Sequence, residues 1–157
     1  MEATINGAFR VLDGKLDVIL SGANEHATYV AVPTGIVGLP IVGSAVAQTP
    51  TWTSSATVNY LRPITRTVDG FFNLTYNEQS GGVQDTVTST APLLGLSRIG
   101  NLSLRAGAKW QRLEAAIFVQ NATDQTLQLL KFQQTGVVYA VRYNQPRTIG
   151  ANAVYRW

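Results

Sequence analysis

The sequence predicts an all-β fold, an antiparallel up-and-down sheet of about seven strands that forms a segment of a transmembrane β-barrel. Apolar and polar residues alternate with a period of two in nearly every segment between turn signals, and no window of about 11 residues shows a helical stripe. Only 13% of the 157 residues are Asp, Glu, Lys or Arg, about half the usual share. The mean hydropathy is nevertheless only +0.06, so uncharged polar residues replace the missing charges.

The expected strands are bounded by turn signals along the whole chain. They span residues 3–12, 15–29, 51–61, 68–77, 102–110, 113–121 and 146–157. The dipeptide Asp13-Gly14 predicts a tight turn after the first strand. Pro63 ends the third strand because proline cannot donate to a ladder, and a two-residue turn at Gln111-Arg112 joins the fifth and sixth strands.

The connections between these strands alternate between short and long. Short ones fall near residues 13, 65 and 111, and long ones span residues 30–50, 80–97 and 122–145, so each kind is expected at its own end of the sheet. The most apolar tract, residues 31–47, is expected to be a loop or an irregular β-excursion. It is shorter than the roughly 20 residues of a spanning helix and contains Pro33 and Pro40. The opening residues show neither the basic nor the apolar region of a secretory signal.

One face of the predicted sheet carries no charge over the expected strands. The charged residues on the opposite face are Arg10, Asp69, Arg105, Lys109, Glu114 and Arg156. Aromatic residues of the apolar face cluster at strand ends, and the separation of Trp52 and Tyr60 projects to roughly 20 Å, close to the height of an outer-membrane apolar band. The aromatic residues expected at the membrane interfaces are Trp52, Tyr60, Tyr76 and Trp110.

Alternation alone does not tell whether the apolar face contacts lipid or a protein core. A soluble lipocalin-like barrel or a sandwich would show the same period with the apolar side chains inside. The mixture of Ala and Gly with Leu, Val and Ile, and the aromatic residues at the strand ends, favour lipid. A charge near the midplane of that face would cost about 2–4 kcal/mol, which explains its composition; the soluble barrel or sandwich is the alternative.

The composition also excludes several classes of site. The chain has no cysteine and a single histidine, His26, so disulfides, thiolate metal sites and sites with several imidazoles are excluded. We find no nucleophile–base set and no Gly-rich phosphate loop, so we expect neither an enzyme nor a cofactor. The net charge of +3 is too small to predict a nucleic-acid partner. The tripeptides at Asn73, Asn101 and Asn121 are glycosylation acceptors only in a eukaryotic secretory pathway.

Three stretches carry a resemblance to a known family. They read QTPTWTSSATVNY, then GNLSLRAGAKWQRLEAAIFVQNATDQ, then QPRTIGANAVYRW. Their order resembles the end of the barrel of TonB-dependent outer-membrane receptors, in which a Pro-x-Trp stretch, an Asn-x-Thr-Asp stretch, a Pro-Arg-Thr-x-Gly stretch and a terminal aromatic residue follow one another. These correspond to Pro50–Trp52, Asn121–Asp124, Pro146–Gly150 and Trp157. The resemblance covers residues 48–157 well and residues 1–47 loosely.

The resemblance implies that residues 1–157 are the C-terminal portion of such a barrel, without the plug domain, in the outer membrane of a Gram-negative bacterium. Short turns would be periplasmic and long loops extracellular. The barrel-assembly machinery would read Tyr155 and Trp157, and TonB would be contacted only through missing N-terminal parts.

The implied function is import of a scarce nutrient such as a siderophore or vitamin. Residues 90–97 and 126–143 would face the outside, where the ligand is captured, and Arg105, Lys109 and Arg156 are the candidates for the lumen. A small self-contained β-barrel that acts as a structural or ligand-binding module is the alternative.

Overall fold

The fold was analysed in a computed structural model that describes residues 1–33, 40–82, 95–126, 128–134 and 137–157. These residues form an all-β structure without helices. Its strands are β1 (Glu2–Val11), β2 (Gly14–Asn24), β3 (Trp52–Pro63), β4 (Val68–Gln79), β5 (Ile99–Trp110), β6 (Leu113–Gln120), β7 (Gln128–Gln134), β8 (Val137–Tyr143) and β9 (Thr148–Tyr155).

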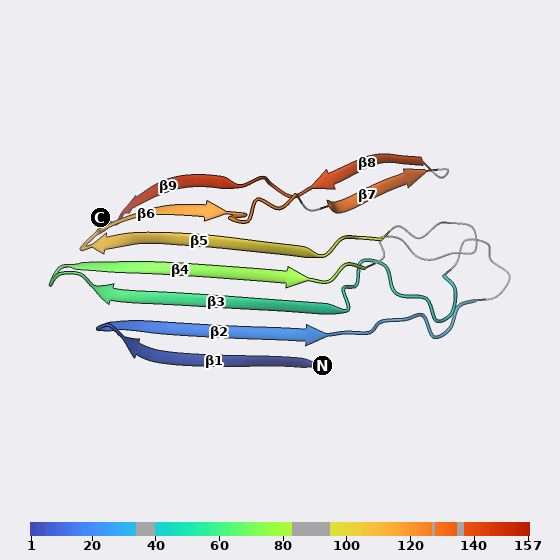
Figure 1. The fold of residues 1–157 in the computed structure, drawn as a ribbon, viewed down its shortest axis with the longest axis horizontal. Coiled ribbons are helices and arrows are strands. Elements are labelled where there is room, and N and C mark those ends of the chain that lie inside the picture. The colour runs from blue at the N-terminus through green and yellow to red at the C-terminus, as the bar shows by residue number, and fades with distance from the viewer. Residues whose placement is uncertain (34–39, 83–94, 127, 135–136) are drawn as a thin grey trace.

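Seven of the described strands form one antiparallel sheet in the order β1-β2-β3-β4-β5-β6-β9, and β7 pairs with β8 in a separate hairpin (Figure 1). This confirms the predicted antiparallel sheet of seven strands. The sheet is open, because β1 pairs only with β2 and β9 only with β6 among the described residues. The outer edges of β1 and β9 therefore lack a partner strand within that part of the chain.

The connections follow the predicted alternation. Residues 12–13, 64–67 and 111–112 join strands at one end of the sheet, which we call the turn end. The longer connections, over residues 25–51, 80–98 and 121–147, lie at the opposite end, which we call the loop end. The chain begins at the loop end and Trp157 lies at the turn end (Figure 1).

The strand register carries the alternation of the sequence across the whole sheet. Ile5 lies opposite Leu20, Leu20 opposite Ala56, and Ala56 opposite Tyr76, so residues of like character align from strand to strand. We call the resulting sides the apolar face and the polar face. The apolar face includes Ile5, Phe9, Leu20, Ala56, Val58, Tyr76, Leu102, Ile117 and Ile149. The polar face includes Asn6, Arg10, Asp17, Asn59, Asp69, Asn73, Asn101, Arg105, Lys109, Glu114 and Asn152.

The apolar face is exposed rather than packed against a second layer. Ile117 is 65% exposed and Ile149 72%. Among the described residues, Ala116 is the one buried hydrophobic side chain. The depressions of the sheet are lined mainly by residues of the polar face. The described strands therefore form a single layer with an uncovered apolar side and a hollowed polar side.

Three expected strands are longer in the structure, β3, β4 and β5, and the residues added to β3 and β4 bear on one prediction. β3 continues to Pro63 and β4 to Gln79. Arg62 lies opposite Gly70, and Glu78 lies opposite Ser54, so both charged residues belong to the apolar face. The prediction that this face carries no charge is correct between these positions and wrong at the two ends.

The connection expected over residues 122–145 is not a simple loop, because it contains the β7–β8 hairpin. Its register shifts between Gln128 and Leu130 and again between Phe132 and Gln133. Such irregularities break the alternation of period two, and alternation is the signal from which the other strands were predicted.

The turn between β1 and β2 is centred one residue earlier than expected. Leu12 and Asp13 have positive φ values of 50° and 64°, and Val11 pairs with Gly14. Gly14 is thus the first residue of β2. A Cβ atom there would lie 2.7 Å from the Leu61 carbonyl oxygen and 2.6 Å from the Tyr60 ring, so the glycine is required by close packing.

The tract over residues 31–47 is irregular where it is described, and residues 34–39 lie outside the described part. An isolated bridge joins Thr28 to Ala45, and a turn follows Ile41 with Gly43 at a φ of 85°. β2 ends at Asn24, before the position expected for its end. A helix with the length and hydropathy needed to cross a membrane does not occur in the described ranges.

Candidate functional site

The polar face brings the three predicted lumen cations toward one carboxylate, Glu114. Arg105 Nη2 lies 2.7 Å from Glu114 Oε1, and Arg156 Nη2 lies 3.7 Å from Glu114 Oε2. Lys109 pairs in register with Glu114 across β5 and β6. The Arg105 guanidinium also lies over the ring of Phe71, 4.7 Å from its centroid, a geometry that attracts a cation to the aromatic face.

This cluster leaves little uncompensated charge in the middle of the polar face. Because Arg105 and Arg156 share Glu114, their charges are partly neutralised within the sheet. Asp69, another carboxylate of the polar face, lies opposite Lys109 in register, but no ion pair joins Asp69 to another described residue. The arrangement suits a water-filled surface better than a strong anion trap.

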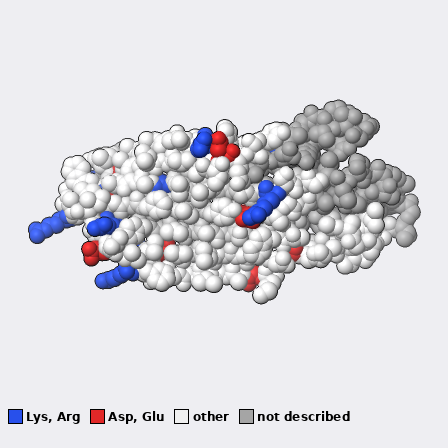
Figure 2. Space-filling view, in the orientation of Figure 1, with Lys and Arg blue, Asp and Glu red and all other residues white. Residues whose placement is uncertain are grey.

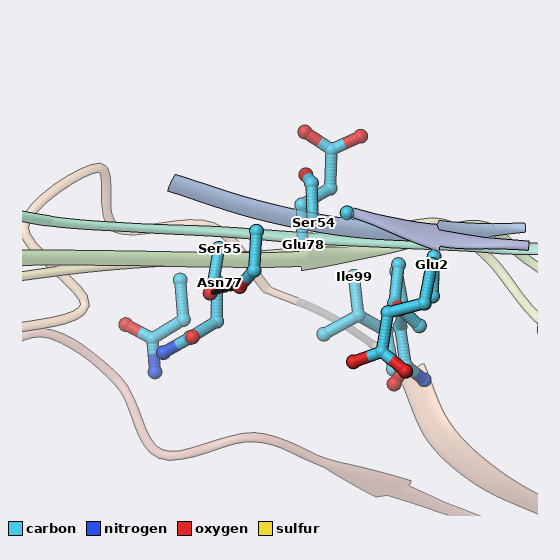
Figure 3. Close-up of a pocket in the computed structure, with 12 residues that line it drawn as sticks. Glu2, Ser54, Ser55, Asn77, Glu78 and Ile99 are labelled. Atoms are coloured by element: carbon cyan, nitrogen blue, oxygen red, sulfur yellow. Dashed lines mark hydrogen bonds between the residues drawn. The ribbon is translucent and has the colours of Figure 1, made fainter. Parts of the chain in front are cut away.

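A second polar feature is a depression at the loop end of the polar face, with a volume of about 330 Å³. Its polar-face lining carries hydroxyl and amide groups from Ser21, Thr53, Ser55, Asn77, Gln79 and Asn101, together with the Glu2 carboxylate and the apolar side chain of Ile99. The hydroxyls of Ser21 and Ser55 lie 2.6 Å apart and share a hydrogen bond. Figure 3 shows Ser55 and Asn77 projecting from one side of the sheet, whereas Ser54 and Glu78 project from the other. The wall can donate and accept hydrogen bonds to a polar ligand.

The sequence did not single out this depression because its residues come from β1 to β5 and are adjacent only in register. Ser21 faces Ser55, Ser55 faces Asn77, and Asn77 faces Asn101 in successive pairs. The signal in the sequence is a run of small hydroxyl and amide residues at alternate positions in each strand. It becomes a site only once the strand alignment is known.

An ion pair lies at the loop end of the apolar face. Arg98 Nη2 contacts Glu78 Oε1, and the Tyr76 hydroxyl donates to Glu78 Oε2 at 2.7 Å. The hydrogen bond to the Glu78 carboxylate raises the pKa of the Arg98 guanidinium from its ordinary value. Glu78 is therefore compensated, although it belongs to the apolar face.

The predicted interface aromatics all lie on the apolar face near strand ends. Trp52 and Tyr76 are at the loop end, and Tyr60 and Trp110 at the turn end. Three of these side chains lie over a glycine of the neighbouring strand: Trp52 over Gly22, Tyr60 over Gly14 and Tyr76 over Gly100. The missing side chains let these rings lean against the sheet.

The two aromatics predicted as an assembly signal differ in their surroundings. Tyr155 is the last residue of β9 and lies opposite Leu113 on the apolar face. Trp157 follows the strand and is exposed. The N–H of Arg156 between them donates to the carbonyl oxygen of Arg112 at 2.9 Å, which fixes the end of the sheet.

The structure also joins two motifs that are separate in the sequence, Asn121–Asp124 and Pro146–Gly150. The Arg147 N–H donates to Asp124 Oδ1 at 3.1 Å, and Arg147 Nη2 lies 3.1 Å from Asp124 Oδ2. Asn121 Nδ2 donates to the carbonyl oxygens of Gln125 and Gln145. These hydrogen bonds thus hold the segment after β6 against the segment before β9.

Other candidate residues have an ordinary placement or lie outside the described part. His26 is exposed, and within the described ranges no group of three or more His, Asp or Glu side chains could hold a metal ion. Asn121 is only 3% exposed and its amide is hydrogen-bonded, so it is no accessible acceptor for a glycan. Of the expected ligand-capturing segments, residues 90–94, 127 and 135–136 are not described.

Comparison with known proteins identifies no family for this chain. No protein-family model, no curated protein and no solved structure matches this chain. A functional proposal therefore depends on the two faces, the connections and the contact between the motifs.

Proposed function

We propose that this chain is the C-terminal portion of the barrel of a TonB-dependent outer-membrane receptor, with lipid against the apolar face and water against the polar face. The observation that carries the proposal is the apolar face, which extends across all seven strands of the sheet without a covering layer and is charged only at its ends, at Arg62 and Glu78. On a soluble protein, a contiguous apolar surface of this size requires a covering partner. A hydrocarbon layer provides one without any further protein contact.

The ends of the apolar face support this proposal. Its charged members, Arg62 and Glu78, lie at opposite ends. A charged side chain near the membrane interface destabilises a barrel by about 0–1 kcal/mol, which is less than the cost of a charge at the midplane. The aromatic residues lie at the same two levels. In the proposed orientation the turn end is periplasmic and the loop end extracellular, so Tyr155 and Trp157 lie where the barrel-assembly machinery acts.

The alternative, a small self-contained soluble barrel, would place the apolar side chains inside. The position of the depressions disfavours this alternative, because they are lined mainly by residues of the polar face. Water would fill that side, and we propose that it forms part of the wall of a lumen.

Neighbouring residues of the central strand β3 offer a direct test of the proposal. Val58 belongs to the apolar face and Thr57 to the polar face, and the native chain contains no cysteine. A fluorophore attached to Val58→Cys, in outer membranes from cells that carry the complete gene, is expected to be quenched by nitroxide lipids. The same fluorophore on Thr57→Cys is expected to be quenched by aqueous iodide instead. Absence of lipid quenching at both positions would identify a soluble barrel.

The loop-end depression indicates the class of nutrient, because its wall of hydroxyls, amides and the Glu2 carboxylate fits a polar ligand that donates hydrogen bonds. Nutrient import is tested by growth of a strain that depends on the complete gene. Growth that is lost on deletion with one nutrient as sole source, and kept with others, would identify the ligand. Equal growth with every nutrient would count against a receptor. We propose that the chain has no enzymatic activity of its own.

A further inference from the structure

Apart from Arg10 on the polar face, three arginines of the described residues lie at the turn end without a carboxylate partner. Arg62 is the penultimate residue of β3, Arg66 lies in the connection to β4, and Arg112 lies in the turn between β5 and β6. All three are exposed. Within the described part of the chain, none of them has an acidic group within ion-pair distance.

At the loop end, two arginines are paired, Arg98 with Glu78 and Arg147 with Asp124, whereas Arg142 in the β7–β8 hairpin has no ion pair among the described residues. These two guanidinium groups are already satisfied by the protein. In Figure 2, blue side chains project beyond the end of the sheet where the short turns lie, with a red group beside some of them.

Each of these cationic positions is associated with exposed apolar side chains. Arg62 follows Tyr60 by two residues within β3, which is about 6.6 Å along an extended strand, and Arg112 follows Trp110 by two residues in the turn after β5. Leu12 and Ile64, in the adjacent turns, are 73% and 63% exposed. An aromatic ring at the edge of hydrocarbon and a long cationic side chain just beyond it are typical of a membrane interface, where arginine reaches toward the headgroups.

We propose that Arg62, Arg66 and Arg112 form a belt that binds the headgroups of anionic phospholipids in the leaflet at the turn end. This inference depends on the proposed function, because it requires hydrocarbon against the apolar face. The guanidinium group forms paired hydrogen bonds with a phosphate oxygen pair, and a negatively charged leaflet attracts each cation near its surface. Nucleic acid is a poorer partner, because Leu12, Ile64 and Trp110 would place apolar surface against it.

The inference is tested by partition of the full chain between buffer and vesicles. One set of vesicles contains phosphatidylcholine alone, and the other contains phosphatidylcholine with phosphatidylglycerol. The chain is expected to bind both and to bind the anionic set about 10- to 100-fold more tightly at low salt. The difference should decrease as salt is raised, because the headgroup contacts are exposed.

A matched pair of double variants shows which cations cause the preference for anionic vesicles. Arg62→Gln/Arg112→Gln removes two cations of the belt and is expected to remove most of the preference for anionic vesicles. Arg10→Gln/Lys109→Gln removes two cations at the same end but on the polar face, so the preference should remain. All four side chains are exposed, and far-UV circular dichroism checks that both variants keep the fold.

The outcomes separate this inference from the proposed function. Failure to bind either set of vesicles would contradict the proposed function itself. Binding to both sets without preference, or equal loss of preference in the two double variants, would overturn only the belt. Tight binding of a DNA duplex that is lost in Arg62→Gln/Arg112→Gln would identify nucleic acid as the partner and would also overturn it.

Discussion

Asn121 connects two parts of the chain that the sequence separates by more than twenty positions. Its Oδ1 accepts from the Gln125 N–H at 3.2 Å, while its Nδ2 donates to the Gln125 and Gln145 carbonyl oxygens at 3.0 and 3.1 Å. Its φ of 49° lies in the left-handed region, which asparagine tolerates better than most residues. Asparagine is therefore suited to this position by both its amide and its backbone.

We expect Asn121→Ala to destabilise the sheet by about 3 kcal/mol, because it removes the three hydrogen bonds of a buried amide. The measurement is urea unfolding of the full chain in detergent micelles, followed by tryptophan fluorescence. Thr123→Ala is the control from the same motif. Its side chain is exposed, so a change within about 0.5 kcal/mol is expected. Equal destabilisation by both variants would show that the amide contacts are not what holds this connection.

At the scale of elements, the alternation of the sequence was sufficient to predict the strands of the main sheet. A period of two assigns each residue to a face before any neighbour is known, so Arg105, Lys109 and Arg156 were placed on the polar face correctly. Their shared partner was not predictable. Whether Arg105 meets Glu114 or Asp69 depends on the register between strands, which a single sequence does not encode in its periodicity.

The same reasoning explains which elements were missed. The β7–β8 hairpin contains register shifts, and the turn at Leu12 and Asp13 uses a non-glycine pair with positive φ. The Asp13-Gly14 dipeptide pointed to the correct place but to the wrong central residues. Turn signals locate a reversal of the chain more reliably than they define its geometry.

The β5–β6 hairpin has one position at which a side chain does not fit. A Cβ atom on Gly107 would lie 2.2 Å from the Ala115 carbonyl oxygen and 2.8 Å from Ala116 Cβ. Both neighbours belong to the opposite strand, and a backbone oxygen cannot move without changing the ladder. Gly107 thus permits a close approach of the two strands.

Gly107→Ala is therefore expected to weaken the β5–β6 pairing and to destabilise the sheet by about 2 kcal/mol or more. Hydrogen exchange of the β6 amides and urea unfolding would measure the effect. Gly95→Ala serves as the control, since an added Cβ there meets no atom within 4 Å. If the two variants were equally stable, the tight approach of β5 and β6 would not exist in solution.

For the whole molecule, the directions of the two edge strands decide how the sheet can be completed. β1 and β9 both run from the loop end to the turn end, so they are parallel to each other. Direct pairing of these edges would create one parallel pair in an otherwise antiparallel sheet. An antiparallel barrel that includes this sheet needs an odd number of further strands between β9 and β1. Open edges are not tolerated in hydrocarbon, where water cannot satisfy the backbone groups.

We therefore predict that the edges of one chain do not close on each other. Ile5 and Ala151 lie on the apolar face of β1 and β9, with the five strands β2 to β6 between them, or roughly 29 Å along the sheet. A disulfide requires Cα atoms within about 7 Å. The variant Ile5→Cys/Ala151→Cys should therefore form no intramolecular disulfide on oxidation, either in micelles or in membranes.

Ala106→Cys/Ile117→Cys provides the positive control, because these residues are direct partners across β5 and β6 and should be linked under the same conditions. Mobility on non-reducing gels distinguishes the linked monomer, the free monomer and a linked dimer. A linked monomer of the Ile5→Cys/Ala151→Cys variant would mean that the chain closes by a parallel pair without further strands. Such closure would make it a self-contained barrel, and the receptor proposal would lose its structural basis.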